Sequence, residues 1–323
     1  MSVRINLDNA GGSVPMNSNV KHVMLTCADT WCNPSARYAT ELKGRIDVAK
    51  DLIRQYVGAT DEDEVIVLSS CSEGIAWAMA QRDVWKCHWN NHHSVFANPK
   101  SIGGDEPEGY IASSVNAETG IRFDREEMKK AKEQGMFCVL DVSQSIGKEE
   151  VCFSRECCDV MVFSTSKVGW RGGVIVIKGG VKMEPLIYGA QENGLRGGTL
   201  DYMNYICTAE SIARYEIRHD YNELWMEAKS ILGEYGSVIE GGLWSTFCIA
   251  LGIETEMIAE ELKDEVLFST GSVCNTGNFD REPFRDAIGI DGGIIRLSFG
   301  KDTTLEEVRE GCTKIMERIK EYV

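Results

Sequence analysis

Short apolar runs bounded by polar or glycine residues recur through the first two-thirds of the chain, and helix-period stretches separate them. Runs of this length that are rich in Val, Ile and Phe predict buried strands, whereas a hydrophobic period near 3.6 predicts helices. Strands that alternate with helices indicate an α/β fold with a mostly parallel sheet, which binds ligands at the carboxyl ends of its strands. The expected strands are 64–69, 137–140, 160–163 and 174–177, and the expected helices are 41–57, 75–80 and 124–134.

The pattern changes after about residue 200. One long helix is expected at 202–235, followed by a strand at 243–251, a helix at 254–263 and a strand at 293–300. The last helix opens with Thr303 and Glu306, a spacing typical of a capping box. We therefore expect a large sheet domain at 1–209 and a smaller α+β domain at 210–323, with the first few residues as candidates for packing against the smaller one.

Composition narrows the classes of function. A chain of 323 residues with 43% hydrophobic content can bury two cores. The net charge of −16 argues against a nucleic acid or an anionic membrane as the main partner, because both attract clustered Lys and Arg. No apolar run reaches membrane-spanning length, and neither a signal sequence nor an Arg-rich presequence opens the chain. We expect a cytoplasmic protein whose fold begins almost at its first residue.

The twelve cysteines predict neither a disulfide framework nor a zinc site. Most are scattered through apolar runs, and no Cys-x-x-Cys spacing occurs, so we expect small core residues in a reducing compartment. Cys274 differs because it lies in a glycine- and hydroxyl-rich loop at 269–278. An accessible thiol of this kind can act as a nucleophile, and the alternative is an ordinary loop cysteine.

Lys167 follows the strand at 160–163 through a hydroxyl-rich turn. A lysine held at a strand end in a partly apolar pocket can act as an amine nucleophile and form a Schiff base with an aldehyde such as pyridoxal 5'-phosphate. The flanking Ser164 and Ser166 can donate hydrogen bonds to its phosphate. A surface lysine after a strand is the alternative interpretation.

Asp141 ends the preceding apolar run, so its carboxylate is expected at the same sheet edge as Lys167. Enzymes that use pyridoxal phosphate place a carboxylate against the pyridine nitrogen, which keeps the nitrogen protonated and makes the ring an electron sink. The combination of Asp141 with Lys167 favours this role over an Asp that only caps a strand.

Two further strand ends carry candidate chemistry. Ser72 lies in the turn between the strand at 64–69 and the next helix, where helix N–H groups and a hydroxyl can bind a phosphate. The alternative is that Ser72 is only an N-cap. His92 follows another short strand and can stack on a cofactor ring or move protons near neutral pH, although a surface histidine pair would look the same.

Arg296 is a single arginine within the apolar strand at 293–300. It can grip a substrate carboxylate with two parallel N–H groups, or it can form a buried structural ion pair, and the sequence leaves both interpretations open. The glycine-rich loop at 189–199 is too long for a tight turn, and loops of this kind often carry functional residues.

The chain resembles the cysteine desulfurases of the NifS/IscS type, in the class V branch of fold-type I pyridoxal phosphate enzymes, nearly from end to end. The order and number of short motifs carry the resemblance. They are Leu7-Asp8-Asn9-Ala10, Asn33-Pro34-Ser35, the 69–73 turn, Asn116-x-Glu118-Thr119-Gly120, Asp141-x-x-Gln144-Ser145-Ile146-Gly147-Lys148, Phe163-Ser164-x-x-Lys167, Glu192-x-Gly194-Leu195-Arg196-x-Gly198-Thr199, Ser272-x-Cys274 and Arg296-x-Ser298-x-Gly300.

The resemblance implies a role for each matching residue. Lys167 would hold pyridoxal phosphate, with Asp141 at the pyridine nitrogen, Gln144 at the ring oxygen and His92 stacked on the ring. The phosphate would be bound by Cys71, Ser72, Ser164 and Ser166, and by Thr199 from the partner subunit of a homodimer. Arg296, Asn33 and Asn116 would bind the substrate L-cysteine. The Cys274 thiolate would take the substrate sulfur as a persulfide, leaving alanine, and an acceptor protein would carry the sulfur to iron–sulfur clusters or thiolation.

Several positions depart from the family pattern. Ala117 stands where members usually have a second Asn, and Ser166 stands where many have a His. The interval between His92 and Asn116 is also shorter than usual. The loop that begins at Cys274 resembles that of molybdenum-cofactor sulfurases, so a sulfurase, a selenocysteine lyase or a small-substrate aminotransferase are alternatives. A catalytically weak scaffold for sulfur transfer is a further alternative.

Overall fold

The computed structural model describes residues 4–323 apart from 12–13, 31, 104–105 and 272–282. Contacts between residues divide the chain into two compact units. The large unit comprises Ser13–Ser114 and Asp124–Tyr215, and the small unit comprises Met1–Gly12, Val115–Phe123 and Glu216–Val323. The chain therefore changes unit at residue 216 rather than 210, and the segment at 115–123, predicted as part of the large domain, belongs with the small unit.

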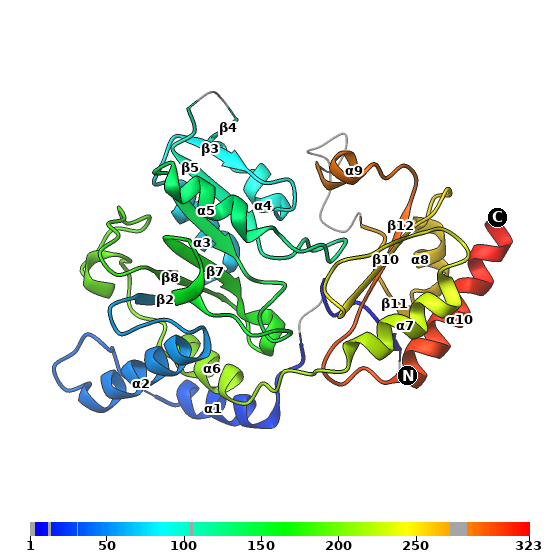
Figure 1. Cartoon of the computed structure of the whole chain (residues 1–323). Helices are drawn as coiled ribbons and strands as arrows, with labels where there is room; N and C mark the ends of the chain where they lie inside the picture. Colours follow the sequence, from blue (N-terminus) through cyan, green and yellow to red (C-terminus); the bar gives the residue numbers. More distant parts are fainter. Residues whose placement is uncertain (1–3, 12–13, 31, 104–105, 272–282) are drawn as a thin grey trace. The chain divides into compact units, whose positions relative to one another are not determined.

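A seven-stranded sheet forms the centre of the large unit (Figure 1). Strand β8 (Gly173–Ile177) runs antiparallel to both of its neighbours, and the other described strand pairs of this sheet are parallel. The mostly parallel α/β sheet predicted from the sequence is therefore confirmed. The strands, in spatial order, are β2 (Glu64–Leu68), β8 (Gly173–Ile177), β7 (Val160–Ser164), β6 (Phe137–Asp141), β5 (Gly109–Ser113), β3 (Val84–Cys87) and β4 (Ser101–Ile102).

Both faces of this sheet are covered, which explains why its strands read as continuous apolar runs. Alternate residues of β6 show the two faces. Phe137 and Val139 enter a core with Trp77 of helix α3, whereas the Cys138 thiol between them contacts the carbonyl of Met128 in α5. Helices α1, α2 and α6 pack together beside the sheet (Figure 1). The helices are α1 (Ser18–Ala28), α2 (Thr40–Tyr56), α3 (Cys71–Met79), α4 (His93–Phe96), α5 (Arg125–Glu133) and α6 (Tyr202–Ala213), with 3-10 turns η1 (Phe153–Arg155), η2 (Thr165–Val168) and η3 (Glu192–Gly194).

The small unit has an antiparallel sheet and a two-stranded parallel sheet. Apolar residues of β10 and β12 and of helices α7 and α10 form its core. Its elements are β12 (Ile294–Ser298), β10 (Thr246–Ala250) and β9 (Ser237–Ile239) in one sheet, β1 (Ile5–Asn6) and β11 (Val266–Leu267) in the other, and helices α7 (Tyr221–Leu232), α8 (Glu256–Leu262), α9 (Pro283–Ile288) and α10 (Leu305–Tyr322). Among the described residues, no helix is both long and apolar enough to cross a membrane.

The prediction of one helix at 202–235 is wrong. Helix α6 ends at Ala213 and α7 begins at Tyr221. The intervening segment contains neither Gly nor Pro, but the Arg218 guanidinium bonds Asp220 and the carbonyl of Thr303, which holds the segment in a non-helical path. The capping box of α10 is also displaced by one residue from the prediction, because Thr304 pairs with Glu307.

Candidate active site

The carboxyl ends of β2, β6 and β7 meet at one edge of the large sheet, because these strands run in the same direction. Gly173 of β8 pairs with Leu68 on one side and with Ser164 on the other, so the ends of β2 and β7 lie in one row. Asp141, the last residue of β6, pairs with Val162. The predicted clustering of strand-end residues is therefore observed at this edge.

Gly173 allows helix α3 to begin close to the edge of the sheet. A Cβ atom on this residue would lie 2.3 Å from the carbonyl carbon of Ser70 and 2.4 Å from the nitrogen of Cys71. These backbone atoms leave no space for a side chain on Gly173. Only glycine at this position lets the start of α3 approach the end of β7.

The start of α3 provides N–H groups and a hydroxyl. The helix begins at Cys71, earlier than predicted, and the N-cap is Ser70, whose Oγ accepts from the N–H of Glu73 at 3.2 Å. Ser72 is therefore not the N-cap, and its side chain is exposed. The first N–H groups of a helix have no partner within it and carry partial positive charge, so an anion is favoured here.

Asp141 is buried, and its Oδ1 atom accepts hydrogen bonds. The N–H of Ser143 donates to it at 2.8 Å, and the thiol of Cys71 lies 3.7 Å away. Burial raises the pKa of the carboxyl group, and the hydrogen bonds from Ser143 and Cys71 and the charge of Lys167 oppose that rise. A further hydrogen-bond donor to the Asp141 carboxylate would also lower its pKa.

Lys167 lies in η2, directly after β7. The turn ends at Gly169, which has a φ of +96°. Asp141 ends β6, and Lys167 and His92 follow the carboxyl ends of β7 and β3, which run in the same direction. The charge of Lys167 lowers the pKa of both Asp141 and His92. The Oγ atoms of Ser164 and Ser166 lie 2.8 Å apart, which places two hydroxyls beside the lysine turn.

His92 is the N-cap of the short helix α4 and is held by its neighbours. Its Nδ1 atom accepts from the N–H of Ser94 at 3.3 Å, and its Nε2 atom lies 3.1 Å from Nδ1 of His93. A neutral imidazole whose Nδ1 atom accepts this bond carries its proton on Nε2. Burial lowers the pKa of His92 to about 4, and the nearby His93 and Lys167 lower it in the same direction. The ring is neutral at physiological pH.

This depressed pKa predicts a pH dependence of stability. An unfolded histidine takes up a proton as the pH falls below about 6.5, whereas folded His92 resists protonation down to about 4. The stabilising contribution is complete above pH 6.5 and is lost as the pH falls towards 4. We expect the unfolding free energy of His92→Asn, which keeps an N-cap acceptor, to fall less than that of wild type as the pH is lowered through this window. The difference between the two decreases should be at most roughly 3 kcal/mol. Urea unfolding at pH 7 and pH 4.5 measures the difference, and parallel losses would contradict it.

Other predicted residues of the large unit lie in simpler settings. The side chain of Gln144 accepts from the Lys148 ammonium at 3.0 Å. Thr199 is exposed. Asn33 is exposed and its Oδ1 accepts from the N–H of Ser35 at 2.9 Å, which stabilises a local turn. The cofactor and substrate roles of these residues stay predictions.

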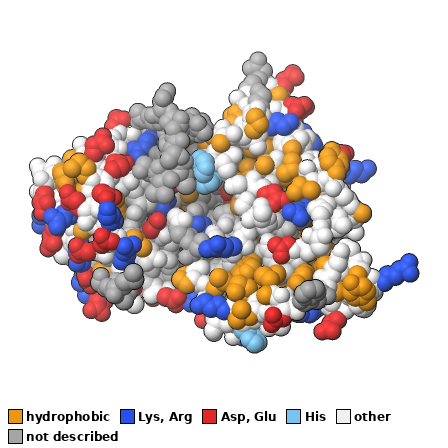
Figure 2. Space-filling model, turned by 180° about the vertical axis from the view of Figure 1, so that it is seen from behind, with side chains coloured by type: hydrophobic (Ala, Val, Ile, Leu, Met, Phe, Trp, Pro, Cys, Tyr) orange, Lys and Arg blue, Asp and Glu red, His pale blue; other side chains and the backbone are white. Residues whose placement is uncertain are grey.

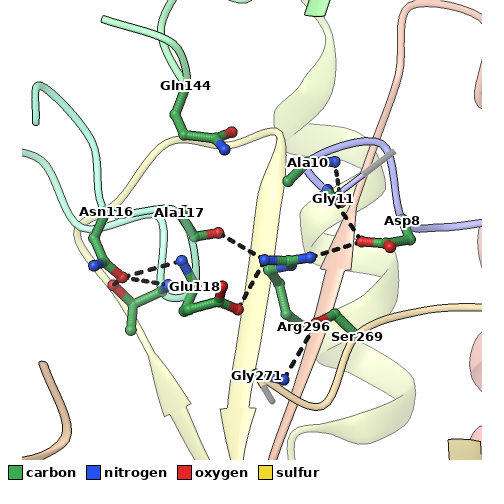
Figure 3. Close-up of polar contacts among 12 residues, drawn as sticks. Asp8, Ala10, Gly11, Asn116, Ala117, Glu118, Gln144, Ser269, Gly271 and Arg296 are labelled. Carbon is green, nitrogen blue, oxygen red and sulfur yellow. Dashed lines mark hydrogen bonds and ion pairs between the residues drawn. The ribbon is translucent and has the colours of Figure 1, made fainter. Parts of the chain in front are cut away.

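Arg296 is buried in β12 of the small unit and forms two ion pairs (Figure 3). Its Nη2 atom lies 2.7 Å from Asp8 Oδ1 and its Nη1 atom lies 2.7 Å from Glu118 Oε2. Nη1 also donates to the carbonyl of Ala117 at 3.1 Å. The buried ion pair, one of the two interpretations of this arginine, is therefore present. Among the described residues, its Nε–H has no hydrogen-bond acceptor.

Asn116 lies next to this cluster and stabilises the turn that presents Glu118. Its Oδ1 atom accepts from the N–H and the hydroxyl of Thr119, both at 2.8 Å (Figure 3). The role of Asn116 in substrate binding stays a prediction. Cys274, the predicted nucleophile, lies outside the described residues.

Sequence reasoning missed several contacts. Ser143 bonds Asp141 and Cys71 but was not singled out, although an Asp followed by an N–H donor two residues later is a recognisable turn pattern. Ser70 caps α3 in place of Ser72. The pairing of Arg296 with Asp8 and Glu118 had no local signal, because the partners are 288 and 178 residues away.

Comparison with known proteins gives a consistent result. The family described as aminotransferase class-V matches residues 105–310. A cysteine desulfurase IscS of Buchnera aphidicola is 30% identical over 226 residues, covering 64% of this chain and 56% of that protein. The mitochondrial cysteine desulfurase of Drosophila melanogaster is 25% identical over 381 residues, covering 97% of this chain and 81% of that protein. A solved NifS-like protein superimposes with a TM-score of 0.84 at 21% identity, covering 99% of this chain and 100% of that one, so the chains share a fold.

Proposed function

The chain belongs to the aminotransferase class-V family of pyridoxal phosphate-dependent enzymes, and we propose that it is a cysteine desulfurase that moves sulfur from L-cysteine to Cys274. The family resemblance and the fold-type I architecture predicted from the sequence motifs are thereby confirmed. The observation that carries the proposal is the gathering of an amine, a buried carboxylate and a neutral imidazole at one sheet edge, with Lys167 acting on both Asp141 and His92.

The residues at this edge fit pyridoxal phosphate by their chemistry. Lys167 offers an amine for the aldehyde, and Asp141 offers a carboxylate for the pyridine nitrogen. The start of α3, with Cys71 and Ser72, and the Ser164 and Ser166 hydroxyls offer donors for the phosphate. When bound, pyridoxal phosphate supplies a protonated ring that withdraws electrons from an attached amino acid.

Each side chain then has a task of its own. Asp141, oriented by the N–H of Ser143, would supply the negative charge that keeps a pyridine nitrogen protonated. The neutral His92 ring would offer an aromatic face without adding a second cation beside Lys167. The Lys167 amine would accept and return a proton during turnover.

Arg296 is proposed to bind the carboxylate of L-cysteine. Its Nη atoms are held by Asp8 and Glu118, and this fixes the guanidinium plane. The buried Nε–H lacks an acceptor among the described residues, and a carboxylate oxygen would satisfy it. Asn33 and Asn116 are proposed to contribute polar contacts to the same substrate.

Sulfur transfer is proposed to occur at Cys274. Its thiolate attacks the substrate sulfur, so that an S–S bond forms as the C–S bond of cysteine breaks. A proton takes the place of sulfur on the substrate carbon, which gives alanine and a persulfide on Cys274. An acceptor protein for iron–sulfur clusters or thiolation then removes the outer sulfur. The cytoplasmic location stays a prediction, supported by the free thiols of the described cysteines.

Product analysis tests this proposal. The purified protein, loaded with pyridoxal phosphate, is incubated with L-cysteine, and alanine is quantified while mass spectrometry locates the added sulfur. We expect alanine and an added mass of one sulfur on the peptide that contains Cys274, in equal amounts. Alanine from selenocysteine only would favour a selenocysteine lyase. Amino-group exchange without sulfur release would favour an aminotransferase, and no turnover of a bound cofactor would favour a scaffold.

A homodimer is proposed, with an apolar patch on the large unit at its interface. Hydrophobic side chains gather on this unit in the region of α1 and α2 (Figure 2). The exposed hydrophobic residues of α1, of α2 and of the segment between them are Leu25, Tyr38, Val48 and Leu52, which are exposed by 61%, 79%, 59% and 36%. Apolar side chains this exposed indicate an interaction surface. A second copy suits the proposal because Thr199 is exposed on the same unit and is expected to reach the partner's phosphate site.

We expect the double variant Tyr38→Glu and Val48→Glu to be monomeric, because two buried carboxylates would have no partners across the interface. Light scattering after size-exclusion chromatography measures the mass. Met226→Glu introduces one such carboxylate at an exposed apolar residue of the small unit and should stay dimeric. If the double variant stays dimeric, these residues do not lie in the dimer interface.

A further inference from the structure

A chain of hydrogen bonds links the strand that precedes Lys167 to the carboxylate of Asp141. The N–H of Ser164, at the end of β7, donates to Ser143 Oγ at 3.0 Å. The Ser143 hydroxyl donates to Cys71 Sγ at 3.4 Å, and the Cys71 thiol donates to Asp141 Oδ1 at 3.7 Å. All four residues belong to the large unit.

Chemistry limits the direction of these bonds. A backbone N–H can only donate, so Ser143 Oγ is an acceptor towards Ser164. Its hydroxyl proton is left for Cys71 or for Asp141, whose carboxyl pKa is lowered by a hydrogen bond from the Ser143 side chain. Burial and the neighbouring Asp141 raise the pKa of the Cys71 thiol well above its usual range. The sulfur therefore keeps its proton and can donate it to the carboxylate.

Both donors to Asp141 use the same oxygen. The backbone N–H of Ser143 and the thiol of Cys71 approach Oδ1. None of the hydrogen bonds among the described residues involves Oδ2. The hydrogen bonds to Oδ1 orient the Asp141 carboxylate, and Oδ2 can accept from a further donor.

We propose that Ser143 and Cys71 act as positioning residues, which orient Asp141 through this chain so that Oδ2 is available to the ring nitrogen of pyridoxal phosphate. The inference rests on the proposed cofactor site and adds two side chains to it. Hydrogen bonds in a chain polarise one another, so the Ser164 and Ser143 links strengthen the last bond from sulfur to oxygen. Removal of either side chain breaks the same chain, and their effects on cofactor binding are therefore coupled rather than independent.

A double-mutant cycle on cofactor affinity tests the coupling. Apo protein of wild type, Cys71→Ala, Ser143→Ala and the double variant is titrated with pyridoxal phosphate, and Kd is taken from the visible absorbance. Ser143→Ala keeps the backbone N–H to Asp141 and removes the hydroxyl, with its bonds to Cys71 and to the Asp141 carboxylate. Each single variant should raise Kd about five- to tenfold, and the double variant should raise it no further. Cys71→Ser, which keeps a donor, should bind more tightly than Cys71→Ala.

Controls separate this role from a structural one. Cys157→Ala, at an exposed cysteine, should bind the cofactor as wild type does, and urea unfolding of the apo proteins reports whether each variant keeps its fold. If either alanine variant does not fold, Cys71→Ser carries the comparison with wild type. Kd increases that multiply in the double variant, or single variants with wild-type Kd, would overturn the inference while leaving the cofactor site intact. A wild-type protein without affinity for pyridoxal phosphate would overturn the proposed function and the inference together.

Discussion

Lys167→Ala is expected to lose the covalently held cofactor and to lower desulfurase turnover by at least about 10³-fold. The amine is the group that can bond the aldehyde of pyridoxal phosphate, and the same amine is proposed to move the proton during turnover. Loss of a group that acts as both nucleophile and base has effects of this size in other enzymes. After dialysis, the variant should lack the visible absorbance of wild type, and alanine release from L-cysteine should fall to background.

Lys178→Ala provides the matched control. Lys178 directly follows β8, which is antiparallel to β7, so it lies at the opposite edge of the same sheet. Its side chain is exposed. This variant should keep both the absorbance and the turnover of wild type. A Lys167→Ala protein that stays yellow after dialysis and releases alanine would place the cofactor on another lysine.

The gathering of strand-end residues at one sheet edge could be predicted from the sequence because its signals are local. Asp141 and Lys167 each follow an apolar run, and the strands' common direction brings their ends to one edge. Gly173 lies at the same edge because it begins the antiparallel strand β8. The backbone of Ser70 and Cys71 leaves no space for a side chain at this position. The prediction therefore needed only strand boundaries and the rule for parallel sheets.

The remaining features depend on tertiary contacts without a local signal. The sequence between α6 and α7 is compatible with a helix, and the bonds of Arg218 to Asp220 and to the carbonyl of Thr303 hold the segment in another path. Ser70 rather than Ser72 caps α3, and either residue is a good N-cap by type. For Arg296, the sequence allowed both an ion pair and the binding of a substrate carboxylate, and the carboxylates that form the ion pairs lie far away in the chain.

Arg296→Ala is expected to lower the unfolding free energy by about 3–5 kcal/mol, because it leaves the carboxylates of Asp8 and Glu118 without their cation. Only 4% of the arginine side chain is exposed, so water cannot replace the guanidinium without opening the small unit. Arg296→Lys keeps the charge but has a single ammonium, which cannot hold both carboxylates and the Ala117 carbonyl with a planar fork. It should fold and should raise KM for L-cysteine more than it lowers kcat.

Arg309→Ala is the matched control for stability. Arg309 also bonds a carboxylate at 2.7 Å, that of Glu227, but 60% of its side chain is exposed. Solvent screens an exposed pair, which therefore contributes little to stability, so urea unfolding should separate the two alanine variants clearly. Adding Glu118→Gln to Arg296→Ala should recover part of the loss, since one unpaired carboxylate is then removed. Equal losses for Arg296→Ala and Arg309→Ala would mean that the buried cluster does not hold the small unit together, and the rigid guanidinium proposed for substrate binding would lose its physical basis.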